Sequence, residues 1–173
     1  MSKTIKFDDA KWHFNSTPDH LSESERWNLA AAHIGLFARW LVRRDWLTMD
    51  IDKSDPMVAE FERDVEAVGR GLMSGTELLG RYFDYKLCNT DIEPAGLAFV
   101  TAYYGDPPKY YDDVTDVIEE MFETSEDKVN FSHLEKILNE RYRQYENHTI
   151  APERPEEPPA SGYFQRLFDQ FKR

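Results

Sequence analysis

Apolar residues recur with the spacing of an α-helix along most of the chain, and alternation with a period of two is nowhere sustained. The longest apolar stripe begins after Ser22 and Glu25, which form a capping box, and predicts a helix to about Trp46. The stripe is wide enough for a helix at the centre of the fold. Its members are Trp27, Leu29, Ala30, Ala31, Ile34, Leu36, Phe37, Ala38, Trp40 and Leu41.

Capping residues and helix breakers predict five further helices. Asp55 followed by Pro56 is typical of a helix start, and Ser74 with Glu77 forms a second capping box. Glu93 and a following proline open another helix, which the Gly-Asp-Pro-Pro sequence at 105–108 ends. The expected ranges are 56–69, 75–83, 94–104, 110–123 and 133–145, with a turn around 84–90. Ser132 is the expected cap of the last helix, and a start near Glu126 is the alternative.

The two ends of the chain differ from its middle. Before Ser22 we expect irregular structure, with a short strand at 4–7 as its one regular element. Prolines among glutamates over 147–161 are typical of an extended linker. Residues 162–173 predict a short basic amphipathic helix, with Phe164, Leu167, Phe168 and Phe171 on one face. The predicted fold is therefore mainly α: one compact domain of about six helices over 1–146, then the linker and the tail helix.

The composition supports a folded protein with an acidic surface. The apolar share of 40%, including 14% aromatic residues, is enough to form a core. However, 33 Asp and Glu stand against 21 Lys and Arg, which gives a net charge of −12. Such a surface repels nucleic-acid phosphates and anionic lipid, whereas it favours fast association with a basic protein. We therefore expect no direct nucleic-acid binding and no stable membrane binding.

Cysteine usage and the N-terminal residues predict a cytoplasmic protein. Cys88 is the single cysteine, so no internal disulfide can form, which suits a reducing compartment. The first residues turn acidic at once and lack the apolar segment of a signal peptide. No apolar run approaches the roughly 20 residues that a membrane-spanning helix needs.

Six carboxylates fall on one face of the helix predicted at 110–123. They are Asp112, Asp113, Asp116, Glu119, Glu120 and Glu123. Asp112, Asp113 and Asp116 also match the Asp-Asp-x-x-Asp pattern with which some enzymes hold magnesium and a diphosphate. No second acidic motif faces the first, so we interpret these residues as a solvated acidic face and expect no cofactor. This face and the apolar face of the tail are the predicted partner-binding surfaces. For the tail, docking on its own domain or on a membrane surface are the alternatives.

Two histidines are the best candidates for hidden chemistry. His13 follows Asp8 and Asp9 closely, and His33 lies within the predicted central helix. Two imidazoles and a carboxylate are able to bind a transition metal or to act as acid and base. The sequence does not show that these residues meet in space, and a buried histidine satisfied by one hydrogen bond is commoner. No catalytic or metal-binding residue is therefore assigned from the sequence.

Several short segments carry a family resemblance from residue 7 to residue 145. They are Phe7-Asp8-Asp9-Ala10-Lys11-Trp12-His13-Phe14, His33-Ile34-Gly35, Phe83-Asp84-Tyr85, Ala95-Gly96-Leu97, Tyr103-Tyr104 and Glu140-Arg141-Tyr142. In order and spacing they resemble a family of small bacterial proteins of unassigned function, although Tyr85 stands where that pattern has a glycine. The resemblance implies no activity. By analogy of size and acidity, such proteins are similar to immunity proteins, which neutralise a toxin by binding it.

Two functional hypotheses follow. The first is an interaction protein, most concretely an immunity-type inhibitor whose acidic face blocks the cationic active site of a basic toxin such as a nuclease. The second is a small enzyme or metal protein that uses His13 and His33 with Asp8 or Asp9. The absence of a recognisable catalytic motif favours the first.

Overall fold

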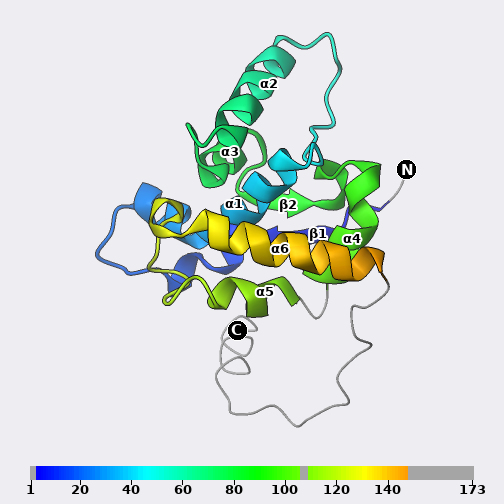
Figure 1. Cartoon of the computed structure of the whole chain (residues 1–173). Coiled ribbons are helices and arrows are strands. Elements are labelled where there is room, and N and C mark those ends of the chain that lie inside the picture. The colour runs from blue at the N-terminus through cyan, green and yellow to red at the C-terminus, as the bar shows by residue number, and fades with distance from the viewer. Residues whose placement is uncertain (1–2, 106–108, 148–173) are drawn as a thin grey trace. The chain divides into compact units, whose positions relative to one another are not determined.

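The computed structural model describes residues 3–105 and 109–147 (Figure 1). The chain divides into two units, 1–138 and 139–173, and α6 (Phe131–Glu146) runs through the boundary. The predicted tail helix, with Phe164, Leu167, Phe168 and Phe171, lies outside the described residues, as does the predicted linker beyond Asn147.

The first unit is built on α1 (Glu23–Arg43), and 13 of its 21 residues are buried. The predicted capping box is present, because the Ser22 side chain accepts from the Glu25 amide while the Glu25 side chain accepts from the Ser22 amide. The helix ends three residues before the predicted Trp46. Asp45 has a φ of 56°, in the left-handed region that a helix cannot continue through.

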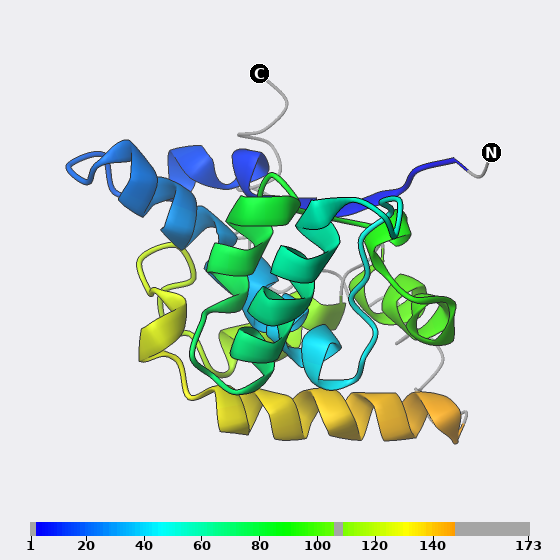
Figure 2. The same ribbon diagram turned by 90° about the horizontal axis from the view of Figure 1, so that it is seen from above.

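α2 (Pro56–Gly69) and α3 (Gly75–Tyr82) follow the predicted bounds closely and lie side by side (Figure 2). Asp55 and Ser74 cap them as expected. α3 packs against α1 where Gly75 faces Gly35, and a Cβ atom on either glycine would overlap backbone atoms of the other helix. Glycine at both positions therefore sets the short distance between α1 and α3.

Two short strands form an antiparallel pair. β1 (Lys6–Asp9) lies two residues beyond the predicted strand, and it pairs with β2 (Lys86–Cys88). The sequence predicts only a turn where β2 lies. Asp84 and Tyr85 reverse the chain just before β2 with φ values of 51° and 55°.

Two helices carry the aromatic core. α4 (Pro94–Tyr104) agrees with the prediction, whereas α5 (Lys109–Thr115) is far shorter than the predicted 110–123. Beyond Thr115 the chain continues in turns. A prolonged helix would carry β-branched residues of low helix propensity and would align like charges on one face, which explains its early end.

The tyrosines of α4 and α5 pack on α1. Tyr104 stacks on Tyr110 at 4.7 Å, and Phe37 of α1 contacts both rings. The Tyr110 hydroxyl donates to the backbone oxygen of His33 at 2.6 Å, so this buried polar group is satisfied.

The last helix begins at Phe131, and Asn130 caps it by accepting from the His133 amide. The predicted cap Ser132 lies inside the helix, and Glu126 belongs to a separate single turn, η4 (Glu126–Lys128). The mainly α prediction is confirmed: six α-helices and one two-stranded sheet make up the described residues. Within 3–105 and 109–147, no helix has the length and apolar character needed to cross a membrane.

Candidate functional site

Three elements bring a carboxylate and two imidazoles together inside the first unit. Asp8 comes from β1, His13 from the end of the short turn η1 (Ala10–Trp12), and His33 from the buried side of α1. The ladder between β1 and β2 is irregular between Lys6 and Asp8, and such irregularities redirect side chains. Asp8 and His33 are 1% and 0% exposed, so the group is internal.

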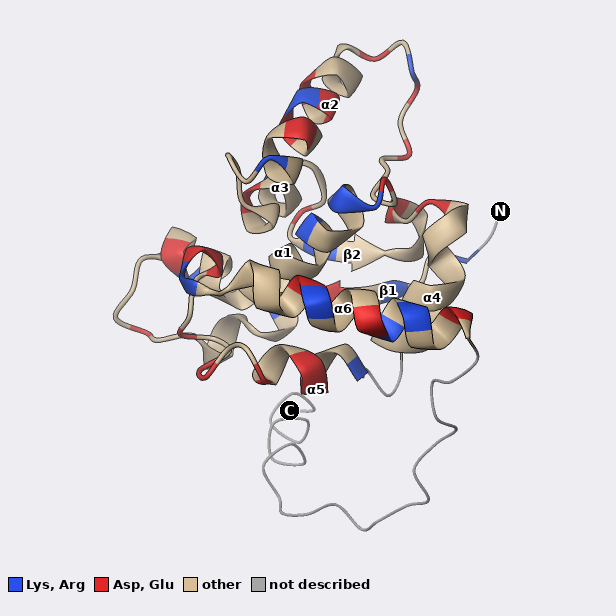
Figure 3. Cartoon of the chain, in the orientation of Figure 1, with Lys and Arg blue, Asp and Glu red and all other residues tan. Residues whose placement is uncertain are grey.

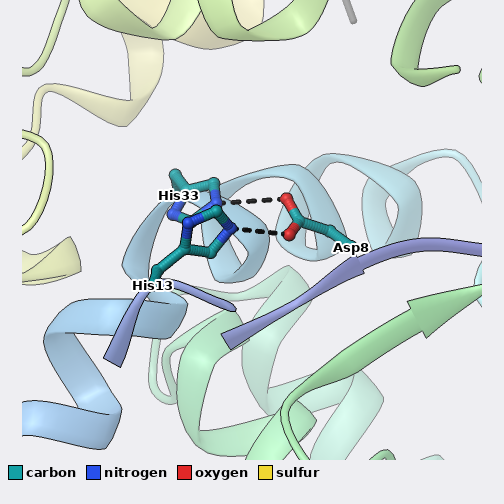
Figure 4. A group of neighbouring side chains, drawn as sticks. All are labelled: Asp8, His13 and His33. Atoms are coloured by element: carbon teal, nitrogen blue, oxygen red, sulfur yellow. Dashed lines mark hydrogen bonds and ion pairs between the residues drawn. The ribbon is translucent and has the colours of Figure 1, made fainter. Parts of the chain in front are cut away.

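Both histidines point at the Asp8 carboxylate (Figure 4). His13 Nε2 lies 2.8 Å from Asp8 Oδ1, and His33 Nε2 lies 3.1 Å from Asp8 Oδ2. The Asp9 amide donates to Asp8 Oδ1 at 2.8 Å. The two rings meet edge to face at 4.8 Å. The structure thus brings His13, His33 and Asp8 together, as the second hypothesis requires.

The Asp9 carboxylate does not join this cluster. It pairs with Lys6 at 2.6 Å and accepts from the Lys11 amide at 3.0 Å, which caps η1. The alternative that the sequence left between Asp8 and Asp9 is therefore resolved in favour of Asp8.

Two tyrosines complete the cluster. The hydroxyls of Tyr104 from α4 and Tyr111 from α5 each donate to Asp8 Oδ2 at 2.7 Å. The Tyr111 oxygen also lies 3.1 Å from His13 Nε2 and 3.2 Å from His33 Nε2. The carboxylate is therefore surrounded by donors from four segments of the chain.

The electrostatics of the cluster favour an ionised carboxylate beside a neutral His33 ring. Burial acts to raise the pKa of Asp8, but the hydrogen bonds and charges of His13 and His33 outweigh it and hold that pKa well below its ordinary value. Burial lowers the pKa of His33, and Asp8 offsets this only in part. Burial, with the Asp8 charge, raises the pKa values of Tyr104 and Tyr111 far enough that both remain phenols and donate.

One ring nitrogen shows how the protons are distributed. His33 Nδ1 is buried and has no hydrogen-bond partner among the described residues. An unpaired N–H would cost more than an unpaired lone pair, so we assign the His33 proton to Nε2, which donates to Asp8. His33 therefore acts as a neutral donor in this arrangement.

Five of the six carboxylates predicted for the acidic face are exposed in the structure. Asp113 does not belong to this face, because Asp113 is 4% exposed and accepts from the Tyr103 hydroxyl at 2.6 Å. The other five carboxylates are exposed, and no ion pair joins them to another described residue. Figure 3 shows acidic residues, in red, on α5 and on the chain beyond it. We call residues 112–123 the acidic segment; its exposed carboxylates are Asp112, Asp116, Glu119, Glu120 and Glu123.

The acidic segment is attached to the histidine cluster at both ends. At its start, Tyr111 bonds to Asp8. Near its end, the Phe122 ring stacks on His13 at 5.1 Å and meets His33 edge to face at 5.8 Å. Between them Ile118 is 2% exposed and anchors the middle. The carboxylates are thus displayed on a segment that is packed against the core.

Sequence reasoning missed Tyr104, Tyr111 and Phe122. Their apolar spacing on predicted helices made them look like ordinary core residues. A weak signal exists, because the chain places two adjacent tyrosine pairs, 103–104 and 110–111, on either side of a helix break. Buried tyrosine hydroxyls need acceptors, and a buried carboxylate or a backbone oxygen is a suitable one.

The chemistry open to the cluster is limited by its burial. His13, 9% exposed, lies at its rim, whereas Asp8 and His33 are out of reach of a large substrate. Asp8, His13 and His33 each offer a ligand atom, and these atoms lie within 4.8 Å of one another. The arrangement therefore suits a small internal ligand better than acid–base attack on an outside substrate.

Comparison with known proteins identifies a family for this chain. No curated protein and no solved structure matches the chain. Residues 6–129 match a domain of unknown function, DUF7832, and this range includes the whole cluster and the acidic segment. The chain therefore belongs to the DUF7832 family.

Proposed function

We propose that this chain is an acidic interaction protein, most concretely an immunity-type inhibitor that binds and neutralises a basic toxin or nuclease in the cytoplasm. The observation that carries the proposal is the acidic segment, with five exposed carboxylates that pair with no other described residue. A carboxylate that is engaged in a local ion pair must break that pair before it binds a partner. The five exposed carboxylates of the acidic segment have no such pair to break.

The net charge of the whole chain also favours binding of a basic partner. At −12, it attracts a basic partner over the Debye length of about 10 Å at 0.1 M salt, and this raises the association rate. Attachment of the acidic segment through Tyr111, Ile118 and Phe122 supports the proposal further. A preorganised surface loses less conformational entropy on binding than a loose one.

The test begins with capture of partners from the native cells by the tagged chain at low and moderate salt, with identification by mass spectrometry. We expect one basic protein, retained at low salt and depleted at higher salt. Its association rate constant is then measured with purified proteins as a function of salt.

A matched pair of variants assigns the effect to a surface. Asp112→Asn, Asp116→Asn and Glu120→Gln together reduce the net charge from −12 to −9, and so does a control with three other exposed acidic residues changed to amides. The control residues are Asp50, Glu60 and Glu62. The first variant should associate at least tenfold more slowly at low salt, while the control changes the rate little. Equal effects would leave only general charge attraction and reject the acidic segment as the binding surface.

A further inference from the structure

We propose that Asp8, His13, His33 and Tyr111 form a binding site for one divalent transition-metal ion of the zinc class. The chemical types of the donor atoms favour zinc over magnesium and calcium. Imidazole nitrogens and a carboxylate are common ligands of Zn²⁺, whereas Mg²⁺ and Ca²⁺ prefer oxygen ligands alone. This site uses none of the acidic segment's carboxylates as ligands, and metal binding goes beyond the proposed partner binding.

The spacing of the donor atoms is close to that around a bound zinc ion. Ligand atoms around a tetrahedral zinc ion, with bonds of about 2.0–2.1 Å, lie about 3.3–3.4 Å apart. Here His13 Nε2 lies 2.8 Å from Asp8 Oδ1, and His33 Nε2 lies 3.1 Å from Asp8 Oδ2. The Tyr111 oxygen lies 3.1 and 3.2 Å from the two Nε2 atoms and 2.7 Å from Oδ2. The donor atoms are therefore close enough to share one ion, and they would have to move apart and turn toward a common centre for tetrahedral coordination.

Tyr111 is the better candidate for the fourth ligand. Its oxygen lies close to the Nε2 atoms of both histidines, whereas the Tyr104 hydroxyl contacts only Asp8 among these groups. Tyr104 then remains a donor to the bound carboxylate, and such support orients a ligand. The rings of Phe122 and Tyr104 limit water around the site.

Metal binding requires the Tyr111 hydroxyl to lose its proton to solvent, which the charge of the ion drives, and it requires a change of tautomer in the rings. Each Nε2 must offer its lone pair, so the ring proton moves to Nδ1. His33 Nδ1 has no acceptor among the described residues, and lack of such a partner weakens metal affinity about 10–100-fold. We therefore expect a reversible site, one that chelators empty, and not a permanently filled structural zinc.

The ion can reach the site past His13. The His13 side chain is 11% exposed, whereas the carboxylate and the His33 ring behind it are enclosed. His13 and Phe122 stack on each other at this rim, so we expect a small ion to enter by displacing these two rings. Burial of the other donors excludes a large substrate.

The experiment is a titration of Zn²⁺ into the full chain after chelator treatment, followed by calorimetry. We expect one ion per chain, with Mg²⁺ giving no binding. Co²⁺ in place of zinc should give the strong visible absorption of a tetrahedral site, and Tyr111→Phe should change that spectrum and weaken binding at least tenfold.

Histidine variants locate the ion. His13→Gln keeps a donor for Asp8 at the rim of the cluster and should lower affinity at least tenfold while circular dichroism stays unchanged. His20→Gln and His133→Gln, which change exposed histidines, are the controls and should bind as the unaltered chain does. Absence of zinc binding to the unaltered chain would overturn the proposal, and so would binding that His13→Gln leaves unchanged or that a control variant removes.

Discussion

At the residue scale, the cluster shows how a buried charge is kept. An isolated carboxylate would be too costly to bury, and Asp8 is satisfied by five donors, namely the Asp9 amide and the side chains of His13, His33, Tyr104 and Tyr111. Removing any one donor leaves part of the desolvation cost unopposed. The stability of the fold is therefore sensitive to the protonation of these few groups.

The pKa of His33 predicts loss of stability in acid. Because burial lowers this pKa below its ordinary value of about 6.5, the unfolded chain binds the proton at a pH where the folded chain does not. The contribution of His33 is fully present above about pH 6.5 and is lost as pH falls through the folded pKa. In chelator-treated protein, urea unfolding should give a free energy that decreases below about pH 6.5. His33→Gln should flatten this decrease, whereas His133→Gln should not; parallel curves for all three proteins would contradict the prediction.

Glu126 is a second buried carboxylate with a structural role. It is 5% exposed and accepts from the Gly75 amide at 3.0 Å and from the Thr76 amide and hydroxyl at 2.8 Å. Glu126→Ala would leave these donors unpaired and should lower the free energy of unfolding by about 1–3 kcal/mol. Asp127→Ala, at the exposed neighbouring position, should change it by less than about 0.5 kcal/mol in the same denaturation assay. Equal losses in both variants would refute this role.

At the element scale, local signals predicted helices well and the strands poorly. Ser22, Asp55 and Ser74 mark their helix starts through hydrogen bonds within a few residues, so the sequence suffices to find them. β2 exists only because β1, about 80 residues earlier, pairs with it, and no local pattern reveals that pairing. Tyr85 illustrates a related point: its φ of 55° is a backbone conformation that glycine adopts more readily than tyrosine.

The residues of the site were predictable where their own chemistry marks them, whereas their contacts across the chain were not. The sequence identified His13, His33 and Asp8 as candidates by chemistry, but their meeting depends on β1 lying against α1. Tyr111 comes from a helix about 100 residues away from Asp8, and the pair that it forms with Tyr110 is only a weak local signal of its role. The charge pattern puts Asp113 on the acidic face, yet within α5 its carboxylate accepts from the Tyr103 hydroxyl, and no local pattern reveals that buried partner.

The contact of α1 with α3 depends on two glycines. Gly35→Ala places a methyl group against the Thr76 backbone and should destabilise the fold by about 1–3 kcal/mol or more, since backbone atoms cannot yield as a side chain can. Gly69→Ala is the matched control, because its Cβ would meet only Val42 at an ordinary 3.7 Å. The control should be neutral or slightly stabilising in thermal unfolding. A Gly35→Ala protein as stable as the control would show that α3 moves freely on α1.

At the scale of the whole first unit, the buried cluster and the acidic surface share one segment. Residues 111–122 begin with a hydroxyl bonded to Asp8 and end with a ring stacked on His13, and the exposed carboxylates lie between or directly beside these anchors. Whatever occupies the cluster therefore changes the anchors of the acidic segment. Two sites that bias the same element are energetically coupled, and the coupling is reciprocal.

Zinc at the proposed site should therefore tighten the acidic segment. Coordination by Tyr111 would replace a hydrogen bond with a metal bond at the start of the segment, which stabilises its packed state. We expect amide hydrogen exchange over 112–123 to slow at least threefold when Zn²⁺ is added to chelator-treated protein, while exchange in α2 stays unchanged. Tyr111→Phe should remove the slowing even where some zinc still binds.

Slowing of exchange that persists in Tyr111→Phe would assign the effect to general stabilisation. Zinc binding with no slowing of exchange would separate the metal site from the acidic segment. Only a slowing that depends on Tyr111 would make the ion a regulator of partner binding, because a free-energy change of about 1.4 kcal/mol in the packed state corresponds to a tenfold change in the fraction of chains ready to bind.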